Sequence, residues 1–161
     1  MSREMKDSGV EWIGEIPSDI TLINTKFLLT YQKGKNPLEI NSDGIGLPYI
    51  GASDLDNNSE NYRYKNYCSE DLPKASKEDV LILWDGARAG LIGTGHEGYI
   101  SSTIVKMNSK SDLINQRFWW WYLKGMQPVL YDWVGGTTIP HMNRNFVYDL
   151  KFVNLDMNKQ L

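Results

Sequence analysis

The chain has 161 residues, of which 41% are hydrophobic and 12% aromatic, and a net charge of −3. This composition predicts one folded domain with a real core and excludes a disordered chain. The single cysteine, Cys68, excludes an internal disulfide and a four-cysteine zinc site. No signal-like N-terminus is evident, and no apolar run approaches the ~20 residues of a membrane span, so we expect a cytoplasmic protein without a membrane partner.

The charge is unevenly distributed along the chain. Residues 1–80 hold 9 basic and 14 acidic residues, whereas residues 81–161 hold 8 basic and 6 acidic ones. Neutralisation of phosphates supplies most of the affinity of non-specific nucleic-acid binding, which an acidic chain does not favour. Contact with DNA would therefore need a local basic face or a partner that adds affinity.

The first half of the chain predicts short elements separated by loops. Residues 1–20 indicate an extended arm packed on the domain, because Pro17 forbids a continuous helix. Residues 21–31 favour a strand, or a strand with a helical turn. Residues 48–50 predict a strand, and residues 69–77 a short helix with acidic residues in its first turn.

Two basic stretches lie in this half. Lys33 and Lys35 belong to a loop, where they are either ordinary solvated lysines or phosphate contacts. In residues 62–67, tyrosines alternate with Arg63, Lys65 and an asparagine. In a strand, this alternation places the tyrosines on one face and the cations on the other. The stretch is either a half-buried strand with a solvated cationic face or a face near a phosphate backbone.

Residues 79–105 form the centre of the sequence. Residues 80–84 and 99–105 are β-prone runs with five glycines between them, which predicts a hairpin-like core. Residues 93–98 match the G-x-G-x-x-G pattern of dinucleotide-binding proteins. That site requires a helix directly after the glycines, whereas a β-prone run follows here. We therefore interpret these glycines as a tight reversal and expect no cofactor in this chain.

The second half contains the clearest helix, predicted over residues 112–124 with a cap at 111–112 and a stop at Gly125. Its three consecutive tryptophans favour core packing over a base-stacking platform, because they point in different directions. A short helix over 128–133 and a strand within 149–155 are expected to follow. The pattern predicts an α+β domain with a mixed, largely antiparallel β-sheet and a few packed helices.

The loop over residues 137–145 carries hydroxyl, amide, imidazole and guanidinium groups, which suit phosphates and base edges. They equally suit plain turns and a helix cap at Asn143. Arg88 and Arg144 are the candidates for reading bases, since a guanidinium can engage guanine in a bidentate way. Arg88 has an alternative role, which is to hold a carboxylate such as Asp85. The candidate DNA-binding residues are Lys33, Lys35, Arg63, Lys65, Arg88, Thr137, Thr138, His141, Asn143 and Arg144.

Four segments together resemble one known family. Residues 7–17 (DSGVEWIGEIP), 84–90 (WDGARAG), 98–103 (GYISST) and 136–141 (GTTIPH) are similar to the target recognition domain of type I restriction–modification specificity (S) subunits. The sequence departs from the family at Ile20, where tryptophan is common. Its end also lacks the proline-rich junction, and the spacer helix of the family would begin only after residue 161.

The resemblance implies a single target recognition domain over residues 1–161 that is non-catalytic and reads one half of a split site in double-stranded DNA. Methyltransferase (M) and restriction (R) subunits would be its partners and would hold S-adenosylmethionine, ATP and Mg²⁺. The chain would be a truncated or half S subunit, and by itself a monomer or weak dimer. Residues that read bases differ between members, so the resemblance does not locate them.

Two other functions remain open at this level. Asp132 and the Asp149-Leu150-Lys151 segment imitate the acid…acid-x-lysine cluster that holds a metal in many nucleases. Such a short pattern also arises by chance. The third reading is a protein-interaction remnant that competes with intact S subunits.

Overall fold

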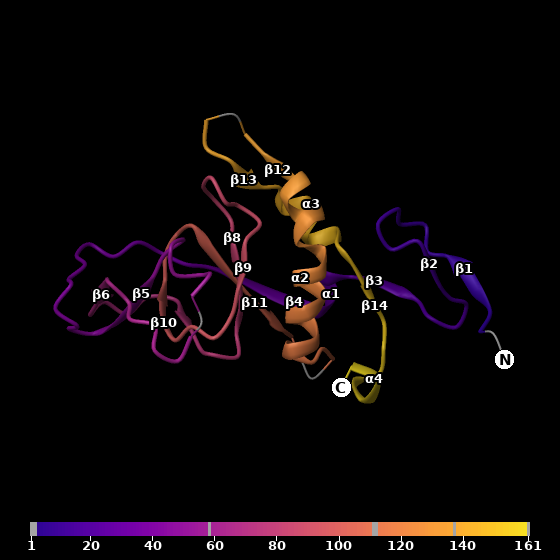
Figure 1. The fold of residues 1–161 in the computed structure, drawn as a ribbon, viewed down its shortest axis with the longest axis horizontal. Helices are drawn as coiled ribbons and strands as arrows, with labels where there is room; N and C mark the ends of the chain where they lie inside the picture. Colours follow the sequence, from indigo (N-terminus) through magenta and orange to yellow (C-terminus); the bar gives the residue numbers. More distant parts are fainter. Residues whose placement is uncertain (1–2, 58, 111–112, 137, 161) are drawn as a thin grey trace.

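The structure is a computed structural model that describes residues 3–57, 59–110, 113–136 and 138–160 (Figure 1). One four-stranded sheet has the order β6 (Tyr67–Cys68), β5 (Leu47–Ile50), β10 (Gly98–Ile100) and β7 (Lys74–Ala75). The other has the order β4 (Leu29–Lys33), β11 (Ile104–Ser109), β8 (Val80–Leu83) and β9 (Ile92–Gly93). Within the described residues, β10 and β5 are the one parallel pair. The predicted α+β class with a mixed, largely antiparallel arrangement is confirmed.

Two-stranded ladders and helices surround these sheets. The ladders pair β1 (Met5–Asp7) with β2 (Glu15–Pro17), β3 (Leu22–Asn24) with β14 (Lys151–Val153), and β12 (Val134–Gly135) with β13 (His141–Met142). The helices are α1 (Thr25–Leu28), α2 (Gln116–Asp132), α3 (Arg144–Asp149) and α4 (Met157–Gln160). In Figure 1, α2 crosses the middle of the molecule, the β5–β6–β10 region lies at the left and the β12–β13 hairpin projects at the top.

Strand β8 separates two hydrophobic cores. All four of its residues are buried, and the side chains of a strand point alternately to opposite faces. Val80 and Ile82 join the core under α2, whereas Leu81 and Leu83 join the core beneath β5 and β10. The short apolar run that predicted a strand is therefore apolar throughout because both of its faces are covered.

The predicted pairing of residues 80–84 with one strand over 99–105 is only partly right. A turn closed by the Ile104 N–H and the Ser101 carbonyl, at 3.0 Å, divides that run into β10 and β11. β11 pairs with β8, whereas β10 joins the other sheet, and the hairpin partner of β8 is β9. The tight reversal predicted for residues 93–98 is confirmed, because strand β10 follows it. Gly98 allows the close approach, since a Cβ there would lie 2.3 Å from the Pro48 carbonyl oxygen.

Helix α2 begins later than the sequence predicts. Its cap is Asn115, whose side chain accepts a hydrogen bond from the Phe118 N–H at 3.0 Å. The predicted cap residues, 111–112, lie outside the described residues. Trp119 is buried, as expected for core packing, whereas Trp121 is 62% exposed.

Helix α2 also ends later than predicted. It continues through Gly125 and Pro128 to Asp132, so the separate helix predicted at 128–133 is its last turn. Met126 and Leu130 are buried and extend the apolar face past the glycine, and this burial overrides the weak helix propensity of Gly125. In the part of the chain that the structure describes, no helix is both long and apolar enough to cross a membrane.

Two further local predictions need correction. Residues 69–77 form no helix, because β7 pairs with β10 and the Glu70 carboxylate accepts the backbone N–H groups of Leu38 and Glu39. In residues 62–67 the tyrosines are half-buried and the cations exposed, as predicted, although only Tyr67 lies in a strand. Contacts with residues distant in the sequence determine the conformation of both segments, and local propensity does not include such contacts.

The two ends of the described chain lie on the α2 side of the molecule. The predicted N-terminal arm is a hairpin of β1 and β2, and Trp12 makes an edge contact with Tyr122 at 6.2 Å between ring centroids. Residues 22–33 form a strand, a helical turn and a second strand, which was one of the two expected arrangements. The strand predicted within 149–155 is β14 and is shorter, because Asp149 ends α3.

Candidate nucleic-acid interface

Three segments meet at one edge of the molecule. The loop after β8 bonds to the β12–β13 hairpin through the Met142 N–H and the Trp84 carbonyl, at 2.8 Å. The Gly86 N–H donates to the Pro140 carbonyl, also at 2.8 Å, and Asp85 forms a β-bridge with His141. We call Lys33, Lys35 and residues 84–90, 134–136 and 138–144 the basic edge. Two segments that resemble the specificity family thus lie side by side.

Lys33 is tied to this edge through an ion pair. Its Nζ lies 2.8 Å from Asp85 Oδ2, and the lysine side chain remains 51% exposed. Gly34 sets the position of both lysines, because a Cβ there would lie 2.1 Å from the Ile100 carbonyl oxygen. The Lys35 N–H donates to the same oxygen at 3.1 Å, which leaves its side chain in solvent.

Arg88 does hold a carboxylate, as the alternative role expected, but the partner is Asp56 and not Asp85. Its guanidinium pairs with the Asp56 carboxylate and donates to the Ala52 carbonyl at 2.7 Å. The side chain is nevertheless 46% exposed, and a guanidinium carries five N–H donors. The Arg88 ion pair is therefore solvent-accessible, and it fixes the direction of the side chain without burying it.

The hairpin and the start of α3 present the remaining candidates. Thr138, His141 and Asn143 are exposed, and Thr137 lies outside the described residues. Asn143 caps α3 by accepting the Asn145 N–H at 3.0 Å, so the predicted capping role is confirmed. The Arg144 guanidinium lies over the Tyr148 ring at 4.8 Å from its centroid. This stacking leaves the edge of the guanidinium, which carries its donors, open to a ligand.

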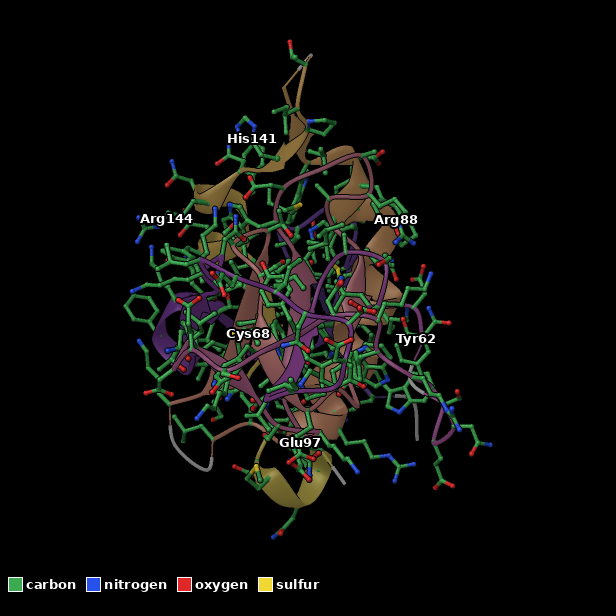
Figure 2. All side chains as sticks on the ribbon, turned by 90° about the vertical axis from the view of Figure 1, so that its left-hand side faces the viewer. Tyr62, Cys68, Arg88, Glu97, His141 and Arg144 are labelled. Carbon is green, nitrogen blue, oxygen red and sulfur yellow. The ribbon has the colours of Figure 1, made fainter. Side chains whose placement is uncertain are left out.

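The predicted site residues fall into two groups. Figure 2 shows Arg88 and Arg144 on either side of the molecule, with His141 above them and with Tyr62 and Glu97 lower down. Arg63 and Lys65 belong to the tyrosine-rich segment and are exposed, and neither side chain makes a hydrogen bond or ion pair with a described residue. Backbone hydrogen bonds and an ion pair join Lys33, the loop after β8 and the hairpin that carries Thr138 and His141, and Asn143 and Arg144 follow this hairpin in the chain. Arg88 lies on the other side of the molecule from Arg144 (Figure 2).

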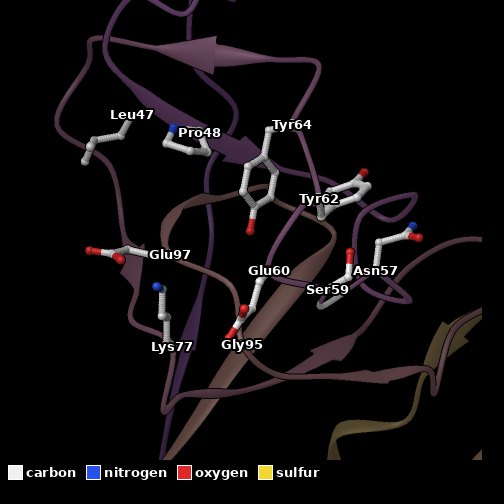
Figure 3. Close-up of a pocket in the computed structure, with 10 residues that line it drawn as sticks. All are labelled: Leu47, Pro48, Asn57, Ser59, Glu60, Tyr62, Tyr64, Lys77, Gly95 and Glu97. Carbon is white, nitrogen blue, oxygen red and sulfur yellow. The ribbon is translucent and has the colours of Figure 1, made fainter.

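The tyrosine-rich segment forms part of a cavity that sequence reasoning missed. This tyrosine pocket has a volume of about 500 Å³ and is lined by Leu47, Pro48, Asn57, Ser59, Glu60, Tyr62, Tyr64, Lys77, Gly95 and Glu97 (Figure 3). The Tyr62 and Tyr64 rings pack edge to face, with centroids 5.2 Å apart. The alternation of tyrosines in the sequence indicated that these side chains face inward. It did not indicate which residues they contact there.

Those partners are two buried polar residues. The Tyr62 hydroxyl donates to Asp54 Oδ1 at 2.6 Å, and the Tyr64 hydroxyl lies 2.9 Å from His96 Nδ1. Because the Asp54 carboxylate accepts this hydrogen bond, the pKa of Tyr62 is raised to about 12. Burial raises the pKa of Tyr64 and lowers the pKa of His96. Both tyrosines and the imidazole are therefore neutral near pH 7.

Two of the three nuclease-like residues, Asp149 and Lys151, are engaged in other contacts. Asp149 Oδ1 lies 2.7 Å from Lys26 Nζ and accepts the Asn24 amide at 3.1 Å. The hydrogen bond from Lys26 lowers the pKa of Asp149. Among the described residues, no three His, Cys, Asp or Glu side chains are grouped so that they could hold a metal ion. The geometry gives no support to a metal-dependent nuclease.

The fold and this edge define an α+β specificity-type domain. Residues 17–153 match the family model described as the type I restriction modification DNA specificity domain, and the chain belongs to this family. It is 28% identical over 138 residues to the type I restriction enzyme MjaVIII specificity subunit of Methanocaldococcus jannaschii. That match covers 84% of this chain and 32% of the relative, so the chain spans about a third of the relative's length.

Solved structures share the fold. The HsdS subunit from Thermoanaerobacter tengcongensis aligns with a TM-score of 0.71 and 17% identity over 97% of this chain and 37% of that one. The type I restriction-modification S subunit from M. genitalium gives a TM-score of 0.65 and 16% identity, over 89% of this chain and 37% of that one. A chain from a structure of type I R-M complex assembly gives a TM-score of 0.72 and 18% identity, over 90% and 36% respectively.

Proposed function

We propose that this domain recognises one half of a split site in double-stranded DNA, as the specificity module of a type I restriction–modification complex. The observation that supports this best is the basic edge. In a domain of this family, it carries two exposed lysines and a hairpin of short polar side chains, with an exposed arginine at either side, Arg88 and Arg144 (Figure 2). These groups are of the kinds that contact phosphates and base edges.

The proposed role is non-catalytic. Methylation and cleavage would belong to M and R subunits, which would hold S-adenosylmethionine, ATP and Mg²⁺. The similarity of this chain to about a third of each specificity subunit supports a modular part within such an assembly. By itself the chain would be a monomer or a weak dimer.

The residues of the basic edge divide into two proposed roles. Arg88 and Arg144 read bases, since each has a fixed direction and exposed donors. Lys33 and Lys35 anchor phosphates, with Thr137, Thr138, His141 and Asn143 as neighbouring hydrogen-bonding groups. Arg63 and Lys65, which lie apart from the edge, would at most contact a flanking phosphate.

The test places this domain in a complete S subunit with its M subunits and maps the methylated sites. Arg144→Ala should relax the preference at one base pair, with a loss of about 1–3 kcal/mol of discrimination. Lys33→Ala should weaken binding to all sequences and reduce the salt slope by about one.

Lys6→Ala is the matched control, because Lys6 is an exposed cation on the distant N-terminal hairpin. Its site preference should equal that of the wild type. Unchanged preference in both Arg88→Ala and Arg144→Ala would overturn the assignment of base readers. If all variants methylate the same sites as a complex without this domain, the domain acts through protein contacts alone.

A further inference from the structure

The tyrosine pocket differs from the basic edge in position and in charge. Tyr62 and Glu97, which line it, lie away from His141 (Figure 2). Its described lining holds two carboxylates, Glu60 and Glu97, and one base, Lys77. Carboxylates repel phosphate oxygens, so this surface is unsuited to a DNA backbone.

The aromatic wall of the pocket is held from behind. The hydroxyl groups of Tyr62 and Tyr64 both bond to buried polar side chains, Asp54 (5% exposed) and His96 (1% exposed). Asp54 is itself fixed, because it accepts the Gly51 N–H at 2.7 Å. The rings are therefore positioned before any ligand arrives, which reduces the entropy lost on binding.

The charged groups at the mouth are not used internally. Figure 3 shows Tyr64 in the middle of the lining, with Glu97 and Lys77 to one side and Glu60 below. None of these three charged side chains forms an ion pair with a described residue. Two carboxylates are thus free to face a ligand that also contacts the aromatic rings. Leu47 and Pro48 add an apolar wall for the stem of such a ligand.

We propose that the tyrosine pocket binds an organic cation, namely a guanidinium or alkylammonium group. Such a cation is attracted to the face of an aromatic ring within about 6 Å of its centroid, and carboxylates complement its charge. The cation comes either from an arginine or lysine side chain of a polypeptide or from a free polyamine. The pocket volume of about 500 Å³ accommodates any of these head groups. This site is independent of the proposed DNA contact.

The test is a ¹⁵N–¹H NMR titration of the full chain. The probes are N-acetyl-argininamide, N-acetyl-lysinamide, spermidine and, as a neutral isostere of arginine, N-acetyl-citrullinamide. We expect saturable shifts of the Tyr64, Gly95 and Glu97 amides with cationic probes and none with the citrulline compound. A preference for the amino-acid probes indicates a polypeptide ligand, and a preference for spermidine indicates a polyamine.

Variants that remove carboxylates distinguish binding in the pocket from non-specific attraction of cations to the acidic chain. Glu60→Gln combined with Glu97→Gln should weaken binding of the preferred probe about fivefold, because both replaced carboxylates line the pocket. Glu11→Gln, at an exposed carboxylate of the N-terminal hairpin, should leave it unchanged. Equal shifts with the citrulline compound, an absence of saturation with every cation, or equal weakening by Glu11→Gln would overturn the proposal. The citrulline comparison uses the wild-type chain, so it does not depend on the folding of a variant.

Discussion

The basic edge and the tyrosine pocket hold their polar side chains in opposite ways. At the basic edge, Lys33 and Arg88 pair with carboxylates that are themselves partly exposed, at Asp85 and Asp56. In the pocket, the tyrosine hydroxyls bond inward to residues that are almost completely buried. The edge therefore offers charges that remain accessible to solvent, whereas the pocket offers rings held by buried partners.

This difference indicates what each region can recognise. Exposed ion pairs are weak and screened by salt, so their cations exchange a carboxylate for a phosphate at low cost. Rings fixed by buried hydrogen bonds cannot adapt, so they favour one shape and one charge. The same domain thus has one surface that suits an extended anion and another that suits a compact cation.

The largest expected effect is on DNA affinity, when one domain is compared with two linked domains. The lone chain should bind its half-site about 10²–10⁴-fold more weakly than a protein that links two such domains, because the effective concentration of the second module is missing. A gel-shift series from about 50 mM to about 200 mM salt measures this difference and its slope. Tight, salt-insensitive binding by the lone chain would contradict a basic edge built from exposed cations.

The next largest effect concerns the backbone between the two lysines of the basic edge. Gly34 lies between Lys33 and Lys35 and packs on β10, so Gly34→Ala forces the Ile100 carbonyl to move. We expect a loss of about 3 kcal/mol in the free energy of unfolding, measured by urea denaturation.

Gly125→Ala is the matched control for this change. A Cβ at Gly125 meets no atom within 4 Å, and alanine favours a helix interior by up to about 1 kcal/mol. The control should therefore be stabilised. Equal effects of the two substitutions would show that close approach at Gly34 is unimportant.

A smaller effect is expected from the acid sensitivity of the pocket. Burial lowers the pKa of His96 below its ordinary value of 6.5. Below about pH 6.5 the unfolded state therefore binds a proton that the folded state does not. The free energy of unfolding then decreases as the pH is lowered. Above the pKa of His96 in the unfolded state, His96 causes no loss of stability. Below it, the free energy of unfolding changes by at most about 1.4 kcal/mol per pH unit.

Urea denaturation between about pH 7.5 and about pH 5 measures this loss. His96→Gln should flatten the profile relative to the wild type, whereas His141→Gln, at an exposed residue of the basic edge, should keep the wild-type slope. Identical slopes in the wild type and His96→Gln would exclude His96 as the titrating group.

The smallest effect belongs to the exposed ion pair of the basic edge. A double-mutant cycle with Lys33→Ala and Asp85→Ala should give a coupling of about 0.5 kcal/mol, because both groups are solvated. Added salt should reduce the coupling further. A coupling as large as that of a buried pair would show that Lys33 serves stability and is not available to phosphate.

Local patterns in the sequence determined many features of this protein. The buried run of β8, the glycine reversal before β10 and the aromatic helix α2 each follow from short-range propensity and burial. The family resemblance rests on ordered motifs and is confirmed by the match over residues 17–153. The exposure of the cations at the basic edge was also expected, because charged side chains are rarely buried.

Tertiary structure alone decided which distant groups meet. The partners of Arg88, Tyr62 and Tyr64 lie at Asp56, Asp54 and His96, at separations of up to 32 residues. The division of residues 99–105 between two sheets and the loss of the helix over 69–77 likewise depend on strand pairing across the chain. Hydrogen bonding and burial stabilise the groups that the fold brings into contact, and the spacing of residues along the chain does not specify these contacts.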